Sequence, residues 1–526
     1  MSASSASSHK IILYIVFALV TVMGILLLVN PAGVYPDAAW GFQVWRGMQK
    51  GHGFNILTLP GQWDIAQNGE EFKSWWSPGQ YLVPGIFQKL FGLDLGHASS
   101  LTVVICQYLG LAGLYQFFKK AGFSKTISAL AILVIALQQS FFTPYIFYNG
   151  GEVLLFAFIG WFLYGCLHFN KPSIALAVFV LLAGWIGFFA KSSFMWMYAA
   201  GLIYMWIQLS RHTTHIKHWL VNGFWVGVPA VISLAVIYVT YLSKGLNPSS
   251  QSLGLDSTIK VFAFPLASPL LAGFSLDDLA NGLIEHNGNV IFNPVQAIII
   301  IALLAVLSIV LICAICKRVP DNRYSTMLVI FYIVSVFFLG SSFFRKLDIS
   351  FEARHFRIIG LLIIPGTIYV FSRAAKAYRY AFGAVVGVVA LFSLKFYVLS
   401  YIGLKTETVY GTSGIAQQFI DKESLDYIRM LDNHNKNAVF VFFSPDLGLE
   451  INHNRSITLE PLNSDISINV DDYIHKGHAG PLYILMPHKY IGIRASVILK
   501  SFPGYKGFSL KELSDNYVLY FATEAR

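Results

Sequence analysis

The sequence predicts a polytopic α-helical membrane protein that carries a small C-terminal α/β domain. Three observations lead to this fold class. Hydrophobic residues make up 56% of the 526 positions and charged residues only 12%, whereas soluble domains have about 25% charged residues. Aromatic residues reach 15%, as expected where Trp and Tyr lie at membrane interfaces. Long apolar runs recur as far as Ile402, and the tail beyond is far more polar.

The apolar runs predict the membrane-spanning helices. A helix needs roughly 20 apolar residues to cross the hydrocarbon core, and about eleven segments approach this length. Lys191 divides one long apolar run into the fifth and sixth of them. The predicted spans are residues 11–29, 99–118, 126–146, 153–169, 173–189, 194–209, 219–242, 294–315, 325–344, 357–371 and 380–402.

Positive charge predicts how these spans are oriented. If the N-terminus is cytoplasmic, nearly every cytoplasmic loop is basic, as the positive-inside rule requires. The outside connections are nearly free of Lys and Arg, except for Lys191 and the group Arg345, Lys346 and Arg354. The net charge of +10 is therefore largely a topology signal and not evidence for nucleic-acid binding. The cytoplasmic residues are Lys10, Lys119, Lys120, Lys125, Lys171, Arg211, Lys217, Lys317, Arg318, Arg323, Arg373, Lys376 and Arg379.

An odd number of spans places the C-terminus outside. We expect a transmembrane domain at residues 1–402, with long outside loops at 30–98 and 243–293, and an outside-facing soluble domain at 403–526. The first apolar run is too long for a signal peptide and is expected to be retained. In the tail, residues 422–431 have helical periodicity, and three apolar runs have strand length. These runs, residues 438–443, 482–486 and 517–522, predict a small sheet packed by helices.

Several site classes are excluded. The four cysteines, Cys106, Cys166, Cys313 and Cys316, lie in or beside predicted spans and imply no disulfide framework. Zinc-ligand spacing, a Walker loop and a dinucleotide fingerprint are all missing from the sequence. The absence of outside cysteines is compatible with a bacterial plasma (inner) membrane.

Lys395 is the one clear charge inside a span, whereas ion-coupled carriers place acids near the midplane. The charges instead gather at the outer surface, which favours an interfacial site.

The first outside loop holds the most informative residue, Asp37. It precedes a largely apolar segment at residues 38–49, which is expected to be a helix in the headgroup region. Ser77 and Pro78 form a suitable N-cap and N1 pair, and residues 81–91 are expected to be a second interfacial helix. Between these helices lies a candidate substrate loop, whose residues are Glu70, Trp75, Trp76 and Tyr81.

Other outside turns add charges that suit a phosphate. Glu152 is a lone acid at a helix start, in Tyr148-Asn149-Gly150-Gly151-Glu152. Lys191 lies in an outer turn, and Arg354, His355 and Arg357 open a late span. The basic side chains are candidates for holding a phosphate through charge-assisted hydrogen bonds.

In the order of these elements, over roughly the first 370 residues, the chain resembles the GT-C superfamily of polyprenyl-phosphate-sugar-dependent glycosyltransferases. That superfamily includes the protein O-mannosyltransferases and the lipid A aminoarabinose transferase. Its members place a catalytic acid where Asp37 stands, then a Gly-containing segment, here residues 45–54, and a Pro-rich aromatic helix ending in a Lys-Leu-Phe-Gly-like tag, here residues 76–92. Glu152 matches a second acid, and Arg354-His355-Phe356 resembles a late Arg-aromatic segment.

The resemblance implies an inverting glycosyltransferase that moves a sugar from a polyprenyl-phosphate-linked donor to a lipid, glycan or protein acceptor. With it, Asp37 is interpreted as the base, and Glu152 as a second site acid that orients the acceptor or holds a divalent ion. Lys191, Arg354, His355 and Arg357 are the candidates for binding the donor phosphate. A divalent cation, with Asp37 and Glu152 as candidate ligands, is compatible with this site but not required. The chain departs from the family because no Glu adjoins Asp37, and because Ser77-Pro78 replaces Pro-Pro. Both departures leave the acceptor class open.

The same residues allow other interpretations. Asp37 is also a good helix N-cap, Glu152 can act as a helix-dipole partner, and Arg354 and Arg357 can pair with Glu352 or with lipid headgroups. A lipid-linked saccharide transporter or flippase is the main functional alternative, and a non-catalytic assembly factor with the same fold is another. Fold resemblance alone does not separate them.

Overall fold

The computed structural model describes residues 4–247, 250–286, 288–459 and 473–525. Its contacts divide the chain into two compact units. The helical unit comprises residues 1–25, 103–145 and 151–400, and the mixed unit comprises residues 26–102, 146–150 and 401–526. The predicted boundary between a transmembrane domain at residues 1–402 and a soluble domain at residues 403–526 stays a prediction, because a division by internal contacts does not test it.

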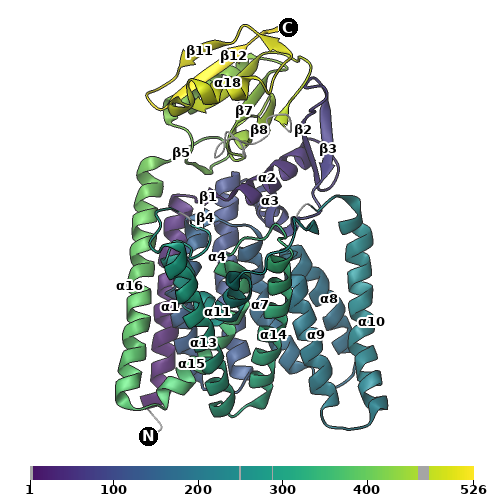
Figure 1. The fold of residues 1–526 in the computed structure, drawn as a ribbon, viewed down its shortest axis with the longest axis vertical. Helices are drawn as coiled ribbons and strands as arrows, with labels where there is room; N and C mark the ends of the chain where they lie inside the picture. Colours follow the sequence, from purple (N-terminus) through teal and green to yellow (C-terminus); the bar gives the residue numbers. More distant parts are fainter. Residues whose placement is uncertain (1–3, 248–249, 287, 460–472, 526) are drawn as a thin grey trace. The chain divides into compact units, whose positions relative to one another are not determined.

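Every predicted span coincides with helical structure (Figure 1). By length and composition, eight helices of the described residues can cross a membrane, or nine if the pair α5 and α6, bent by 70°, is one span. The chain is therefore a multi-pass membrane protein. The helices are α1 (Ser4–Val29), α4 (Leu95–Lys120), α5 (Lys125–Ala136), α6 (Gln139–Phe142), η1 (Thr143–Tyr145), α7 (Gly151–His168), α8 (Ile174–Ala190), α9 (Phe194–Ser210), α10 (Ile216–Thr240), η2 (Leu242–Lys244), α13 (Pro294–Arg318), α14 (Asn322–Phe344), η4 (Ala353–Phe356), α15 (Arg357–Ser372) and α16 (Lys376–Glu407).

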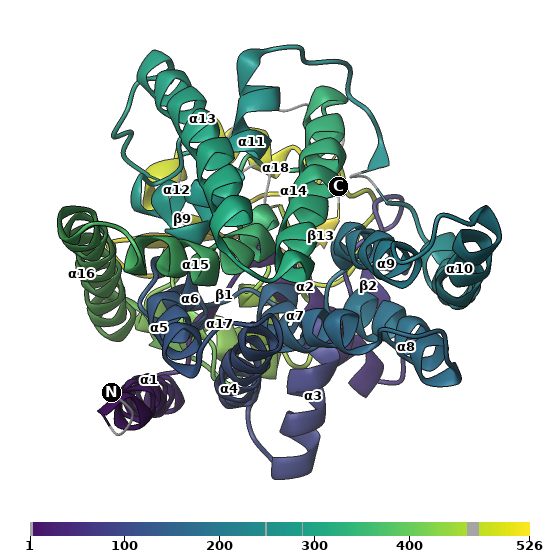
Figure 2. The ribbon, with the colours of Figure 1, turned by 90° about the horizontal axis from the view of Figure 1, so that it is seen from below.

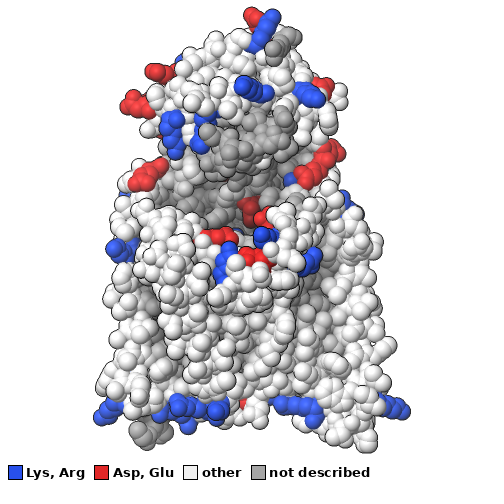
Figure 3. Space-filling model, viewed as in Figure 1, with Lys and Arg blue, Asp and Glu red and all other residues white. Residues whose placement is uncertain are grey.

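Charge is distributed along the helical unit as a membrane environment requires. Lys and Arg side chains gather along the lower edge of Figure 3, and the band above this edge is almost free of charged side chains. Helix α4 ends in Lys119 and Lys120, and α13 ends in Lys317 and Arg318. This pattern favours a cytoplasmic position for that edge, and the orientation stays a prediction.

The prediction of a loop over residues 243–293 is wrong in part, because this stretch contains the helix α11 (Ile259–Gly273) and the short helix α12 (Leu276–Leu279). Ten of the 15 residues of α11 are buried. It packs against α13, α14 and α15, and Figure 2 shows it beside α13. Two internal prolines, Pro265 and Pro269, and a length below the roughly 20 residues of a full span concealed this helix from the sequence pattern.

Residues 30–98, which were predicted to be the first outside loop, contain both predicted helices and a hairpin that was not predicted. Helix α2 (Pro36–Gln49) agrees with expectation. Helix α3 (Gly79–Phe91) contains the expected run 81–91, and it begins one residue after the expected N1 position because its N-cap is Pro78 rather than Ser77. The antiparallel strands β2 (Ile56–Pro60) and β3 (Asn68–Phe72) form the hairpin. Four of the five β3 residues are exposed, so β3 lacks the apolar alternation by which strands are recognised.

The tail forms a five-stranded sheet in the order β11-β12-β9-β7-β8. The three predicted strands and the predicted helix are confirmed as β7, β9, β12 and α17. Strands β8, β7 and β9 are parallel, and β12 and β11 continue the sheet antiparallel. The tail elements are β5 (Val409–Tyr410), β6 (Ala416–Gln417), α17 (Lys422–His434), β7 (Val439–Phe442), η5 (Leu447–Glu450), β8 (Arg455–Thr458), β9 (Leu482–Pro487), η8 (His488–Tyr490), α18 (Ile493–Leu499), β10 (Tyr505–Lys506), β11 (Ser509–Glu512), β12 (Tyr517–Ala522) and β13 (Glu524–Ala525).

Candidate active site

Asp37 lies in the first turn of α2, where a short parallel strand pair fixes the entry of the helix. Strand β1 (Gly33–Val34) pairs with β4 (Phe147–Tyr148), and the amide of Tyr35 donates to the carbonyl of Tyr148 at 3.1 Å. Tyr35 is the N-cap and Pro36 occupies N1, as proline commonly does. Asp37 is therefore not the N-cap. Its carboxylate is exposed, near the positive end of the helix dipole.

Packing makes the start of α2 rigid. Ala38 and Ala39 are buried, and the ring of Phe42 stacks on Tyr148 with centroids 5.5 Å apart. The hydroxyl of Tyr148 donates to the carbonyl of Gln80 at 2.5 Å. Helix α2 thus contacts both β4 and the start of α3, so the backbone beneath Asp37 is held from two sides.

The predicted substrate loop separates into exposed and structural residues. Glu70 is exposed on β3, and its carboxylate lies 3.8 Å from Nδ1 of His52. Trp75 and Trp76 are half-buried, with ring centroids 5.3 Å apart. Tyr81 is 1% exposed and its hydroxyl donates to Asn55 at 2.7 Å, so its side chain is part of the packing.

Lys73, which the sequence reasoning did not select, lies at the centre of this loop. It is 7% exposed. Its Nζ is 2.6 Å from Glu71 and 4.2 Å from the ring centroid of Trp75. Burial lowers the pKa of Lys73, and the hydrogen bond to Glu71 opposes this shift. A buried lysine among tryptophans is a candidate for anion binding, and its position between the acidic pair Glu70-Glu71 and the pair Trp75-Trp76 was the available signal.

Glu152 and its partners form a second group, within the helical unit. Glu152 lies in the first turn of α7. It forms ion pairs with Lys191, which follows α8, and with Nη1 of Arg354 at 3.7 Å. Arg354 also pairs with Glu352, as one alternative expected. The Lys191 and Glu152 side chains are 17% and 18% exposed. Three elements far apart in the sequence thus bring two cations onto one carboxylate.

A clamp outside the predicted site orients the Arg354 segment. Asp277, on α12, accepts hydrogen bonds from the amides of Leu283 at 3.0 Å and Ala353 at 2.9 Å. It thereby fixes the start of η4, from which Arg354 and His355 project. His355 Nε2 lies 3.1 Å from Oγ of Ser350.

Asp278 adds a further charge beside the start of α15. Burial raises the pKa of the Asp278 carboxyl to about 6, and the Arg357 guanidinium acts in the opposite direction. Arg357 is therefore electrostatically coupled to an acid that the sequence reasoning did not select. The dipeptide Asp277-Asp278 in an otherwise apolar stretch was the signal.

The part of the chain that the structure describes contains no group of three or more His, Cys, Asp or Glu side chains arranged to hold a metal ion. The candidate metal ligands Asp37 and Glu152 are thus not part of such a group. What the described residues do provide is cationic side chains, held by carboxylates, that suit a phosphate.

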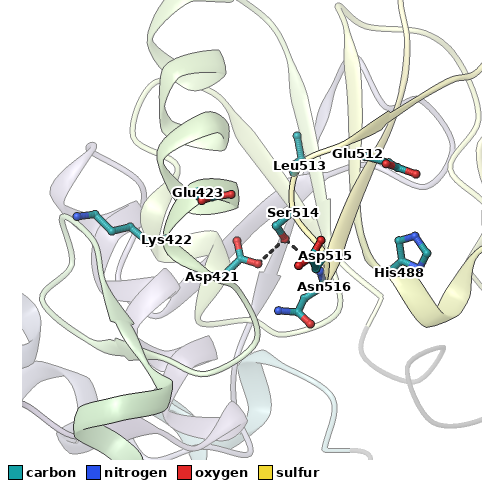
Figure 4. A pocket seen from close by; sticks show the side chains of 9 residues that line it. All are labelled: Asp421, Lys422, Glu423, His488, Glu512, Leu513, Ser514, Asp515 and Asn516. Carbon is teal, nitrogen blue, oxygen red and sulfur yellow. Dashed lines mark hydrogen bonds between the residues drawn. The ribbon is translucent and has the colours of Figure 1, made fainter.

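A separate open groove of about 800 Å³ lies in the tail. Figure 4 shows Asp421 directed toward Ser514, and Ser514 Oγ donates to its carboxylate. Asp421 is also the N-cap of α17 and accepts from the Ser424 amide at 3.0 Å. Its carboxylate therefore serves the fold of the tail.

Comparison with known proteins concerns the fold. No protein-family model and no curated protein matches the sequence. The structure is similar to that of ArnT from Cupriavidus metallidurans bound to undecaprenyl phosphate, with a TM-score of 0.53, 12% identity and 97% of each chain covered. The apo state of ArnT gives a TM-score of 0.51 at the same identity and coverage. The chain has a GT-C glycosyltransferase fold.

The apo oligosaccharyltransferase of Archaeoglobus fulgidus gives a TM-score of 0.49 and 11% identity, with coverage of 94% of this chain and 73% of that one. At the 12% identity with ArnT, the likeness concerns the fold, and function has to be inferred from side chains.

Proposed function

We propose that this GT-C protein is an inverting glycosyltransferase that takes a sugar from a polyprenyl-phosphate-linked donor and passes it to a hydroxyl group of a lipid, glycan or protein acceptor. The observation that carries the proposal is the exposed Asp37 carboxylate on the rigid first turn of α2. The structural similarity to ArnT, solved with undecaprenyl phosphate bound, supports a donor of the same chemical class.

In the proposed reaction, Asp37 is the general base. It takes the proton of the acceptor hydroxyl while the acceptor oxygen attacks the anomeric carbon of the sugar. The bond from that carbon to the phosphate oxygen breaks, and its electron pair leaves with the polyprenyl phosphate. A phosphate is a good leaving group once its charge is stabilised, so the reaction needs cations more than it needs an acid.

The departing phosphate is proposed to be stabilised by the preorganised electrostatics of Lys191, Arg354, His355 and Arg357. Lys73 is proposed for the same role because it is a buried cation. Glu152 takes a different role from the one expected of a catalytic acid. Because it forms ion pairs with both Lys191 and Arg354, we assign it the positioning of these two cations.

The proposed reaction takes place at the outer face of a plasma (inner) membrane, with the N-terminus cytoplasmic and the tail outside. The supporting observation is the gathering of Lys and Arg at one end of the helical unit, which the positive-inside rule assigns to the cytoplasm.

The decisive experiment compares wild type with Asp37→Asn, both purified into lipid and offered a panel of undecaprenyl-phosphate-linked sugars. We expect wild type to release sugar from one donor, at least by slow hydrolysis, and Asp37→Asn to be slower by about 10²- to 10⁴-fold while it still binds undecaprenyl phosphate. Asp426→Asn on the exposed face of α17 is the matched control, since its side chain is 58% exposed. Equal rates for wild type and Asp37→Asn would contradict the role of Asp37.

A further inference from the structure

The far end of α2 is bound by the tail. Arg46 Nη1 donates to the carbonyl of Gly448 at 3.0 Å, and Nη2 donates to Oδ1 of Asn452. One helical turn earlier, Gln43 Nε2 donates to the carbonyl of Pro445 at 2.6 Å. Lys50 Nζ donates to the carbonyl of Asn452 at 3.1 Å. All of these residues belong to the mixed unit.

The tail segment that receives α2 is itself preorganised. Glu450 is 1% exposed, and its carboxylate accepts from the Thr412 amide at 2.7 Å and from Oγ of Ser413. Asp432 is 2% exposed and accepts from the amides of Asn452 and Asn454 at 2.7 and 3.0 Å. Segment 445–454 is therefore held by two buried carboxylates.

Arg46 is electrostatically coupled to both of these carboxylates. Burial lowers the pKa of Arg46, and the charges of Glu450 and Asp432 act in the opposite direction. Since arginine stays protonated in proteins, its guanidinium supplies a permanent positive charge to this group. Loss of Arg46 would leave two buried carboxylates without that charge.

The fit is also steric. A Cβ added at Gly448 would lie 2.7 Å from Nε2 of Gln43 and 3.0 Å from Oγ of Ser456. Glycine at 448 therefore permits the close approach of α2. Nine residues of helix separate Arg46 from Asp37, which is about 13–14 Å at 1.5 Å per residue.

We propose that the tail segment 445–454 positions α2, and with it Asp37, and that Arg46 is the main positioning residue of this contact. The tail then has a task in catalysis without touching the substrate. The effect on turnover rests on the proposed function of Asp37, whereas the effect on the order of α2 does not.

The test compares Arg46→Ala with Arg455→Ala in the full chain in lipid. Arg455 is the matched control because it also joins the tail to an earlier segment of the mixed unit. Its Nη1 donates to the Ala66 carbonyl at 3.1 Å and to Asn68 at 3.2 Å, and neither of these residues belongs to α2. We expect faster amide hydrogen exchange over residues 37–42 in Arg46→Ala only.

With the panel donor that wild type consumes, we also expect kcat to fall by about 10- to 100-fold in Arg46→Ala, with little change in KM. Gly448→Ala, which acts from the tail side, should give the same signature and keeps the test decisive if Arg46→Ala does not fold.

Unchanged exchange over residues 37–42, or equal acceleration in Arg46→Ala and Arg455→Ala, would overturn the proposal. Faster exchange over residues 37–42 in Arg46→Ala with unchanged kcat would also overturn the proposal, provided that Asp37→Asn is inactive. If Asp37→Asn remains active, the proposed function fails, and the exchange result still decides whether the tail positions α2.

Discussion

The two acids that the sequence selected as catalytic lie in opposite surroundings. Each occupies the first turn of a helix, Asp37 on α2 and Glu152 on α7. Asp37 is exposed. Glu152 is 18% exposed and forms ion pairs with Lys191 and Arg354. Two acidic side chains at the same helical position are therefore placed differently, one open to solvent and one held as a counter-charge to two cations.

Burial decides which role is available. A carboxylate between two cations is held in its charged form by its partners, and the ion pairs offset the cost of removing all three charges from water. An exposed carboxylate is accessible to an acceptor hydroxyl. The difference suggests that Asp37→Asn should alter chemistry with little effect on stability, and that Glu152→Gln should alter stability first.

The largest expected effect on stability comes from Glu152→Gln. Removing Glu152 leaves the half-buried charges of Lys191 and Arg354 without their shared partner, at a cost of up to about 3 kcal/mol, the value for a fully buried pair, whereas Asp37→Asn at an exposed position should cost less. Denaturant unfolding in detergent would measure both. The double variant Glu152→Gln/Lys191→Met should regain part of the loss. Equal stability of the two single variants would remove the distinction between the two acids.

Asp278 provides an intermediate case, because it is half-buried and its pKa is raised to about 6 by burial, with Arg357 acting in the opposite direction. An ordinary aspartate has a pKa of about 3.9, so the folded state holds the proton more tightly than the unfolded state. The stability contributed by Asp278 is therefore fully present below about pH 4 and is lost as pH rises through about 6.

This loss amounts to about 3 kcal/mol at most, at 1.36 kcal/mol for each pKa unit. In Asp278→Asn the fall in the free energy of unfolding between pH 4 and 7 should be smaller than in wild type by this amount. Unfolding curves at several pH values would measure it, and identical pH dependence in the two proteins would show that the Asp278 carboxyl has an ordinary pKa.

Sequence patterns predicted those parts of the molecule that rest on local hydrophobicity. The predicted spans coincide with helices, and the three apolar runs of the tail are strands of one sheet. Asp37 could be selected because a charge beside an apolar span is conspicuous. Whether it is the base stays a prediction.

Features that depend on contacts between distant segments could not be predicted. Helix α11 carries two prolines and is shorter than a span, so its burial becomes evident only beside α13 and α15. One of the two amides that donate to Asp277 belongs to Ala353, 76 residues away. The ion pairs of Glu152, which change its proposed role, likewise join three separate elements.

The smallest predicted effect tests the turn that leads into α7, just before Glu152. Gly150 has φ of +58° and Gly92 has φ of +65°, so an alanine at either position costs about 1 kcal/mol of backbone strain. The surroundings differ. A Cβ at Gly150 would lie 2.4 Å from Oε1 of Gln80, whereas nothing lies within 4 Å at Gly92.

Gln80 is 6% exposed, so its side chain has little room to move away from the added methyl group. Gly150→Ala should therefore be less stable than Gly92→Ala by about 1 kcal/mol, the lower end of the range for an overpacked site. Because Gln80 adjoins the start of α2 at Gly41, Gly150→Ala should also slow turnover of the panel donor, and Gly92→Ala should not. Unfolding and donor consumption measured on the same two samples would separate the strain that both variants share from the contact that only Gly150 makes. If the two variants behaved alike in both measurements, the contact of the turn with Gln80 would have no part in holding α2.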